Sequence, residues 1–380
     1  MIRGKIMLKT TITRSLALIL CLALLVSWAM CLGGCVKSGP NLPVNTDDGF
    51  NTDSGNIVIV TPLPHGESTP GNTYTPEAGS ESPVIADETP ATGETATAPA
   101  ETPTEVPTKT AEPEITLNID TKAIYSRSVL LKDIDTGRFL YSLSPDMRIY
   151  PASLTKMMTG LLAAEMLSAD KMYEVTSEAI ERAYSFGAST GGFEPGEFTD
   201  KDGILGGILM ASAAECSFTA AIELCGSEEA FVKLMNSRAQ ELGMNGTHFA
   251  NCTGLHNDDH YSTVEDLMKL AEHALKNPDF VRFFTLDTFK VITDPPRKDQ
   301  LTLISTVFSG LANYDYGEVN ILGGKTGYTR QAGLCLATYS LYAGHHYILI
   351  TAANDGNLYT EKYHFIDAEY IYRVLQEELR

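Results

Sequence analysis

The chain has 380 residues, of which 43% are hydrophobic, and its formal net charge at pH 7 is −20. This length suits one large domain or two ordinary ones. Basic residues form no patch or stripe along the sequence, so the composition argues against a nucleic-acid-binding protein.

Residues 1–35 have the pattern of a bacterial export signal, in which basic residues precede an apolar run, LALILCLALLVSWAM. That run is short for a membrane span. After Cys31, the four residues LGGC, numbers 32–35, resemble a lipobox that ends at Cys35. The resemblance implies that Cys35 is acylated and anchors the protein to the outer face of the cytoplasmic membrane. An uncleaved N-terminal anchor is the alternative, and it also places the rest of the chain outside the cytoplasm.

Residues 36–120 are predicted to be a disordered linker rich in Thr, Pro and Glu. This stretch holds 12 of the 18 prolines and has 14 acidic residues against 2 basic ones. Because large apolar side chains are scarce, such a chain cannot bury enough surface to offset the entropy lost on ordering. The linker is either a tether that lets a membrane-anchored domain reach into the cell wall or a low-complexity spacer whose exact length has no function.

Residues 121–380 are predicted to form one α/β domain with a mainly antiparallel sheet and a helical part. Two strands around the turn DTG are expected within 126–146, and a second hairpin with AGHH at its turn within 333–355. Helices are expected at 153–167, 202–226, 227–244, 263–277 and 358–380, with Ser227 and Thr263 as N-caps. Strands that cluster in hairpins favour an antiparallel sheet.

The segment SLTK places Ser153 and Lys156 three residues apart. On a helix these positions share one face, so a lysine whose pKa is lowered by burial could take the serine proton. Taken alone, the motif is more often a helix start that happens to contain a serine and a lysine.

Two later motifs favour a catalytic role for Ser153 and Lys156 over a chance helix start. Lys325, Thr326 and Gly327 form a KTG sequence, suited to a cleft wall in which Lys and Thr bind a carboxylate and glycine admits the substrate. Ser212, in MASAAECS, lies between the two motifs. The order matches the S-x-x-K, S-x-N and K-T-G set of penicillin-binding proteins and class A β-lactamases.

The chain therefore resembles the low-molecular-weight penicillin-binding proteins, the serine D-alanyl-D-alanine carboxypeptidases. The similarity extends to YPASLTKMMT, GFEPGEFTDKDGILGGILMAS, the run from FVKLMNSRAQ to EDLMKLA, and GGKTGYTRQAGLCL. Many members add a C-terminal β-domain and an anchoring helix. We expect the anchor here at the N-terminus instead.

The resemblance implies a role for each matching residue. Ser153 would be the acylated nucleophile, Lys156 its base and Ser212 a proton relay to the leaving group. Lys325 and Thr326 would hold the substrate carboxylate beside Gly327. The backbone N–H groups of Ser153 and Tyr328 would form the oxyanion hole. The reaction would remove the terminal D-alanine from a peptidoglycan stem peptide, with β-lactam antibiotics as inhibitors and no metal or organic cofactor.

One position departs from the family pattern. The second motif usually ends in Asn, whose amide can both donate and accept hydrogen bonds, and here it ends in Ala214. Losing one hydrogen bond to substrate could cost about 1–3 kcal/mol. A weakly active or inactive penicillin-binding wall protein is therefore the alternative. Glu215 follows and, on a helix, is expected to point elsewhere.

Alternatives remain for the activity itself and for the roles of the cysteines and histidines. A β-lactamase is less favoured because no Glu-x-x-Leu-Asn element follows the second motif, and endopeptidase action remains open. Cys216, Cys225, Cys252 and Cys335 lack metal-ribbon spacing, which leaves buried thiols or one disulfide. His256 and His260, with two aspartates between them, are less favoured as a metal site than as part of a loop.

Overall fold

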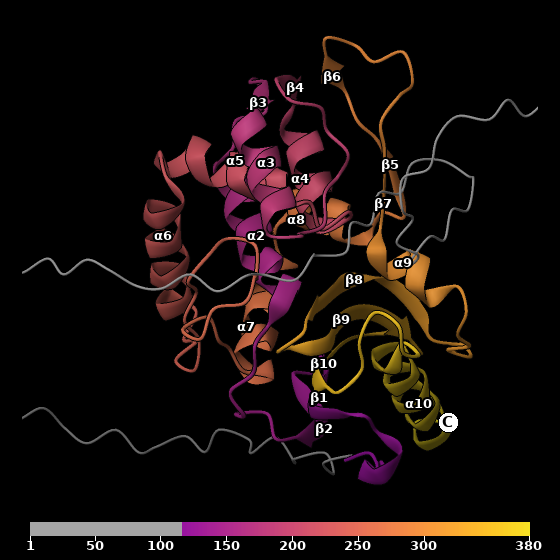
Figure 1. The fold of residues 1–380 in the computed structure, drawn as a ribbon. Helices are drawn as coiled ribbons and strands as arrows, with labels where there is room; N and C mark the ends of the chain where they lie inside the picture. Colours follow the sequence, from indigo (N-terminus) through magenta and orange to yellow (C-terminus); the bar gives the residue numbers. More distant parts are fainter. Residues whose placement is uncertain (1–115) are drawn as a thin grey trace, which may run out of the picture. The chain divides into compact units, whose positions relative to one another are not determined.

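The computed structural model describes residues 116–380, so the signal segment, Cys35 and nearly all of the linker lie outside the described residues. Among the described helices, none is both long and apolar enough to cross a membrane. The predicted α/β class with an antiparallel sheet is confirmed. Figure 1 shows the sheet with helices on both faces.

A five-stranded antiparallel sheet is the centre of the domain, with strand order β2-β1-β10-β9-β8. Strand β1 pairs with β10 along its length, so Ser126 lies opposite Asn354. The first and last strands of the chain are therefore neighbours near the middle of the sheet. The bounds are β1 Ser126–Asp133, β2 Arg138–Leu143, β8 Asn320–Thr329, β9 Gly333–Tyr342 and β10 His345–Asn354.

Helices and two small sheets fill the sequence between β2 and β8. These helices are η2 Ala152–Thr155, α2 Lys156–Met166, α3 Ser177–Ser185, α4 Lys201–Leu209, α5 Ala214–Cys225, α6 Glu228–Glu241, α7 Val264–Ala274, α8 Pro278–Thr285 and α9 Thr306–Leu311, and a short helix, η1 Thr121–Ala123, precedes β1. The small sheets pair β3 Tyr173–Val175, β4 Glu197–Thr199 and β6 Thr293–Asp294, and β5 Thr288–Lys290 with β7 Thr302–Ile304. The closing helix is α10, Tyr363–Glu378.

The two faces of the sheet supply two separate hydrophobic cores. Successive side chains of a strand point to opposite faces. Leu130 accordingly joins the core beneath the helices between β2 and β8, whereas Val129 and Leu131 join the core beneath α10. Figure 1 shows α10 lying across the strands on that second face.

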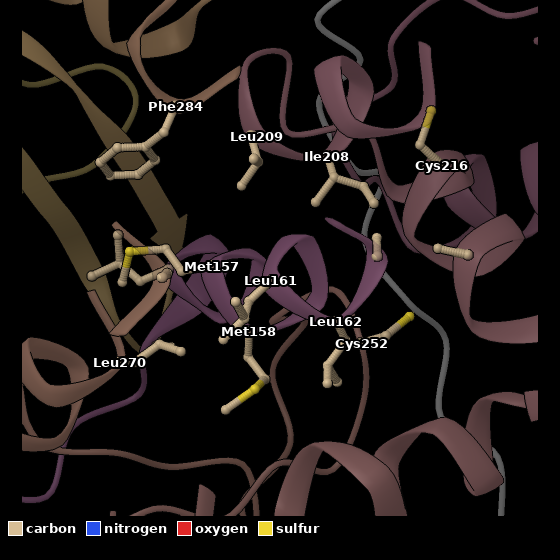
Figure 2. Close-up of a cluster of buried hydrophobic side chains, with 14 of the residues drawn as sticks. Met157, Met158, Leu161, Leu162, Ile208, Leu209, Cys216, Cys252, Leu270 and Phe284 are labelled. Atoms are coloured by element: carbon tan, nitrogen blue, oxygen red, sulfur yellow. The ribbon is translucent and has the colours of Figure 1, made fainter. Parts of the chain in front are cut away.

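Helix α2 lies inside the first core rather than on the surface. Its residues from Lys156 to Ala164 are all buried. Figure 2 shows Met157, Met158, Leu161 and Leu162 among side chains from neighbouring elements, such as Leu209 of α4, Leu270 of α7 and Phe284 of α8. Fully burying an aliphatic side chain contributes about 1.5–3 kcal/mol, so this packing holds the start of α2 firmly in place.

Most expected elements are found, with shifts at their ends. Ser227 and Thr263 cap α6 and α7, accepting from the N–H groups of Ala230 and Asp266. The region 202–226 is two buried helices, α4 and α5, because the chain turns at residues 210–213. The second hairpin turns at Ala343 and Gly344, so both histidines already belong to β10.

Candidate active site

Ser153 lies in a 3-10 turn that leads into α2, rather than on the α-helix itself. Ala152 and Leu154 on either side are buried, whereas Ser153 is only partly buried. Ala152 has φ of 46°, a left-handed conformation that is costly for a residue with a side chain. The backbone strain thus lies directly before Ser153, whose hydroxyl is the one in this turn that is not fully buried.

Lys156 directs its amine at that hydroxyl. Its Nζ donates to Ser153 Oγ at 3.2 Å and to the Thr253 carbonyl at 2.7 Å. The side chain is 2% exposed, and burial lowers the pKa of the Lys156 amine to about 8. A general base works best with a pKa near the operating pH, so this amine is suited to accept the serine proton.

Strand β8 closes against the same turn through Gly327. A side-chain Cβ at Gly327 would lie 3.0 Å from the Ser153 backbone nitrogen and 3.2 Å from the Ala152 Cβ. A side chain at this position would press on the turn, so a glycine suits the close approach of the strand to Ser153. Tyr328 follows Gly327 on β8, the strand that packs on the turn carrying Ser153, and its part in the oxyanion hole stays a prediction.

Lys325 is fully buried in β8 rather than open to solvent. Its Nζ donates to the Thr326 carbonyl at 3.0 Å. Burial, together with the charge of Lys156, holds the pKa of the Lys325 amine well below its usual range. The two lysines therefore share one low-dielectric region, in which each positive charge disfavours the other. Carboxylate binding by Lys325 and Thr326 remains a prediction.

Thr306 links β8 to the second motif. Thr326 Oγ1 donates to Thr306 Oγ1 at 2.8 Å, and the Thr306 N–H donates to the Met210 carbonyl at 3.0 Å. Ser212 lies two residues further on, 4% exposed and with φ of 61°. Its turn joins α4 to α5, and both helices pack on α2. The three motifs thus meet around the start of α2, although the relay role of Ser212 stays a prediction.

The two residues after Ser212-Ala213, Ala214 and Glu215, are both buried at the start of α5. Ala214 begins α5 and is fully buried. Glu215 does not point to solvent: it is 1% exposed, in the first turn of a helix that packs on α2. Both side chains at the start of α5 are therefore buried in the domain.

A loop at residues 251–260, which the sequence did not mark as part of the site, supports the turn that carries Ser153. The Thr253 carbonyl accepts from Lys156, and a Cβ at Gly254 would lie 1.8 Å from the Ala152 carbonyl oxygen. His260 Nδ1 accepts from the Ala250 N–H at 3.1 Å, so its Nε2 donates to Thr155 Oγ1 at 2.7 Å. The histidine was a weak metal candidate, but the structure uses both of its ring nitrogens to hold this loop against the turn.

Among the described residues, the remaining candidates form neither a metal cluster at the site nor a disulfide. His256 lies 3.5 Å from Asp258 and forms no cluster with His260. Cys216, Cys225, Cys252 and Cys335 are free, which favours the prediction of thiols over a disulfide. Among the described residues, one group of possible metal ligands occurs, at the hairpin ends, where His345 Nδ1 is 3.0 Å from Asp133 Oδ2.

Comparison with known families agrees with this geometry. The family model described as D-alanyl-D-alanine carboxypeptidase, Peptidase_S11, matches residues 113–355. D-alanyl-D-alanine carboxypeptidase DacF of Bacillus subtilis is 36% identical over 212 residues, which are 56% of this chain and 53% of that protein. DacA of Escherichia coli K12 is 27% identical over 62% of this chain and 54% of that protein.

A relative named for a different activity is also similar. A D-alanyl-D-alanine endopeptidase of Pseudomonas aeruginosa is 31% identical over 56% of this chain and 66% of that protein. The chain thus spans about half the length of the carboxypeptidase relatives it matches.

Two solved structures show the same fold. The Streptomyces K15 DD-transpeptidase aligns with a TM-score of 0.58 and 23% identity, over 66% of this chain and 97% of that one. A D-alanyl-D-alanine carboxypeptidase from Mycobacterium tuberculosis H37Rv aligns with a TM-score of 0.59 and 20% identity, over 70% and 96%. At this level of identity the likeness concerns the fold alone.

Proposed function

Because the chain belongs to the D-alanyl-D-alanine carboxypeptidase family, we propose that it is a serine hydrolase that removes the terminal D-alanine from peptidoglycan stem peptides. The observation that carries the proposal is the 3.2 Å contact between Lys156 Nζ and Ser153 Oγ, with Gly327 pressed against the same turn. A nucleophile and its base are thereby placed beside a strand that can receive an extended peptide.

The proposed reaction has two stages. Ser153 Oγ attacks the carbonyl carbon of the penultimate D-alanine while its proton passes to Lys156, and the oxyanion forms opposite the N–H groups of Ser153 and Tyr328. The C–N bond then breaks, and the leaving D-alanine amine takes a proton relayed through Ser212. Water finally attacks the acyl-serine ester and restores the Ser153 hydroxyl. A β-lactam would acylate the same oxygen and remain attached for longer.

A fluorescent penicillin tests the nucleophile. The purified protein should form a covalent label that survives denaturation, and Ser153→Ala should form none. Release of D-alanine from a synthetic pentapeptide should disappear in the same variant, because both reactions need the serine oxygen. Covalent label that persists in Ser153→Ala would overturn the assignment of the nucleophile.

The same assay distinguishes the alternatives. Label without measurable D-alanine release would favour the weakly active wall protein suggested by Ala214, which the family match does not favour. Rapid turnover of the β-lactam would favour a β-lactamase. Cleavage of cross-linked stem peptides faster than of the pentapeptide would favour an endopeptidase, the activity named for the Pseudomonas aeruginosa relative.

We also propose that the protein is a lipoprotein held on the outer face of the cytoplasmic membrane by a lipid on Cys35. The LGGC sequence after an apolar run supports this, and the acidic, proline-rich linker would separate the domain from the membrane. Cells fed radiolabelled palmitate should label the protein, and Cys35→Ala should lose the label and the membrane association. Unchanged labelling of that variant would contradict the proposal.

A further inference from the structure

Glu215 is a buried carboxyl group for which the proposed reaction has no use. It lies in the first turn of α5 and is 1% exposed. Its Oε1 accepts from the Gly191 N–H at 2.6 Å, whereas Oε2 has no hydrogen-bond partner among the described residues. Burying a carboxyl group with one oxygen unpaired is costly, so its retention calls for a reason.

The surroundings of Lys156 supply that reason. Helix α5, which carries Glu215 and Cys216, packs on α2, which begins with Lys156. The other titratable groups that interact with the Lys156 amine are Cys252 and His260 in the supporting loop and Lys325 on β8. Burial lowers the pKa of the His260 imidazole to about 3, so it carries no charge at neutral pH. Burial raises the pKa of both thiols well above its ordinary value, so neither is charged at neutral pH. Among these groups, Glu215 is therefore the one that can bring a negative charge to Lys156.

We propose that Glu215 is a positioning residue that acts through Lys156, as the internal countercharge for the ammonium formed when Lys156 accepts the Ser153 proton. This inference rests on the proposed function, because it concerns the base of that reaction. The Ser153 O–H bond breaks and an N–H bond forms on Lys156, so one positive charge appears beside the buried Lys325. A fixed carboxylate on α5 offsets that charge without any rearrangement.

The hydrogen bond to Gly191 keeps the carboxylate in place. The Ala214 N–H also donates to the Ser189 carbonyl at 2.8 Å, and Arg297 Nη2 donates to the Gly192 carbonyl at 2.9 Å. The segment at residues 189–192 is thus tied to the start of α5 on one side and to Arg297 on the other. Glu215 can therefore remain beside α2 rather than swing toward solvent.

The countercharge should give a particular pH dependence. Burial raises the pKa of the Glu215 carboxyl to about 7, and the pKa of Lys156 is about 8. Below pH 6 the carboxyl is protonated and contributes no charge. Above pH 7 it is ionised, which makes the Lys156 amine more basic and therefore a stronger proton acceptor.

Glu215→Gln is the test, because glutamine keeps an acceptor for the Gly191 N–H and removes only the charge. The rate of Ser153 acylation by a fluorescent penicillin is measured from pH 5.5 to 10. We expect the two curves to coincide below about pH 6, and the variant's midpoint to fall by about 0.5–1 pH unit. Its plateau above pH 9 should be about 2- to 3-fold lower, because a less basic amine is a weaker base.

A matched control is Glu223→Gln, the same chemical change at an exposed position of the same helix, and it should leave the whole curve unchanged. A purely structural defect in Glu215→Gln would lower the rate equally at every pH and leave the midpoint in place. A rate lowered equally at every pH, or a curve identical to that of the native protein, would overturn the inference. The proposed function would still stand in either case if the native protein forms the covalent penicillin label. No label in the native protein would instead overturn the proposed function.

If thermal unfolding shows that Glu215→Gln does not fold, the native protein provides the second measurement. Its acylation curve should contain two ionisations, because protonating Glu215 changes the basicity of Lys156. A curve described by a single ionisation would overturn the inference.

Discussion

At the scale of single residues, the pairing of Ser153 with Lys156 could be predicted from their spacing, and its geometry could not. The i, i+3 rule assumes an α-helix, whereas a 3-10 turn at Ala152–Thr155 carries the serine and the lysine begins α2. The positive φ of Ala152 has no sequence signal, because alanine rarely adopts it. The burial of Glu215 could not be predicted for a related reason, since it depends on where α5 begins.

Gly254 offers a test of how closely the supporting loop holds the nucleophile turn. With φ of 83°, it lies where a Cβ would be 1.8 Å from the Ala152 carbonyl oxygen. Gly254→Ala should slow Ser153 acylation by about 100-fold, because misplacing a reacting group by about 1 Å has effects of that size. It should also lower the free energy of unfolding by about 2 kcal/mol or more.

Gly243→Ala is the matched control for this prediction. Gly243 has φ of 69°, and its Cβ would meet nothing within 4 Å. In this control, backbone strain should lower the free energy of unfolding by about 1–2 kcal/mol, and the acylation rate should stay unchanged. Equal acylation rates in the two variants would show that the loop does not position Ser153.

At the scale of elements, the sequence predicted what local patterns encode. The caps at Ser227 and Thr263 were found because a capping hydroxyl and the amide it accepts from are three residues apart. Two hairpins of the main sheet, β1–β2 and β9–β10, were found because their turns are short. The strands β3 to β7 were not predicted, because each has only two or three residues, too few to show an alternating pattern.

The supporting loop at 251–260 was missed as part of the site for the same reason. Lys156 and Thr253 are 97 residues apart in sequence, and Thr155 and His260 are 105 apart. A histidine beside two aspartates suggests a metal site when only neighbours are read. Its actual partner, the Thr155 hydroxyl, becomes visible only when the tertiary contacts are known.

At the scale of the whole molecule, buried histidines should make stability depend on acid. His364, in the first turn of α10, is 4% exposed, and burial lowers the pKa of its imidazole to about 3. The unfolded chain binds this proton below about pH 6.5 and the folded chain does not. The histidine therefore lowers stability progressively as pH falls from about 6.5 to 3, by about 1.4 kcal/mol per pH unit.

His364→Leu should remove this contribution. The free energy of unfolding, measured in urea at pH 7, 6, 5 and 4, should fall less steeply with acid in the variant, by about 1.4 kcal/mol per pH unit. His260 has a pKa of about 3 as well and is present in both proteins, so the variant keeps part of the dependence. Parallel curves for the two proteins would contradict the prediction.

The pairing of β1 with β10 has a consequence for the order in which the molecule can be completed. Synthesis delivers Ser126 more than 200 residues before Asn354, its partner in the sheet. Contacts that close such long loops form late and slowly. Gly327 reaches the Ser153 turn from β8, which is also synthesised late. A nascent chain therefore cannot complete this contact until the last described strands have been made, and under the proposed function its activity would report that these strands have folded into place.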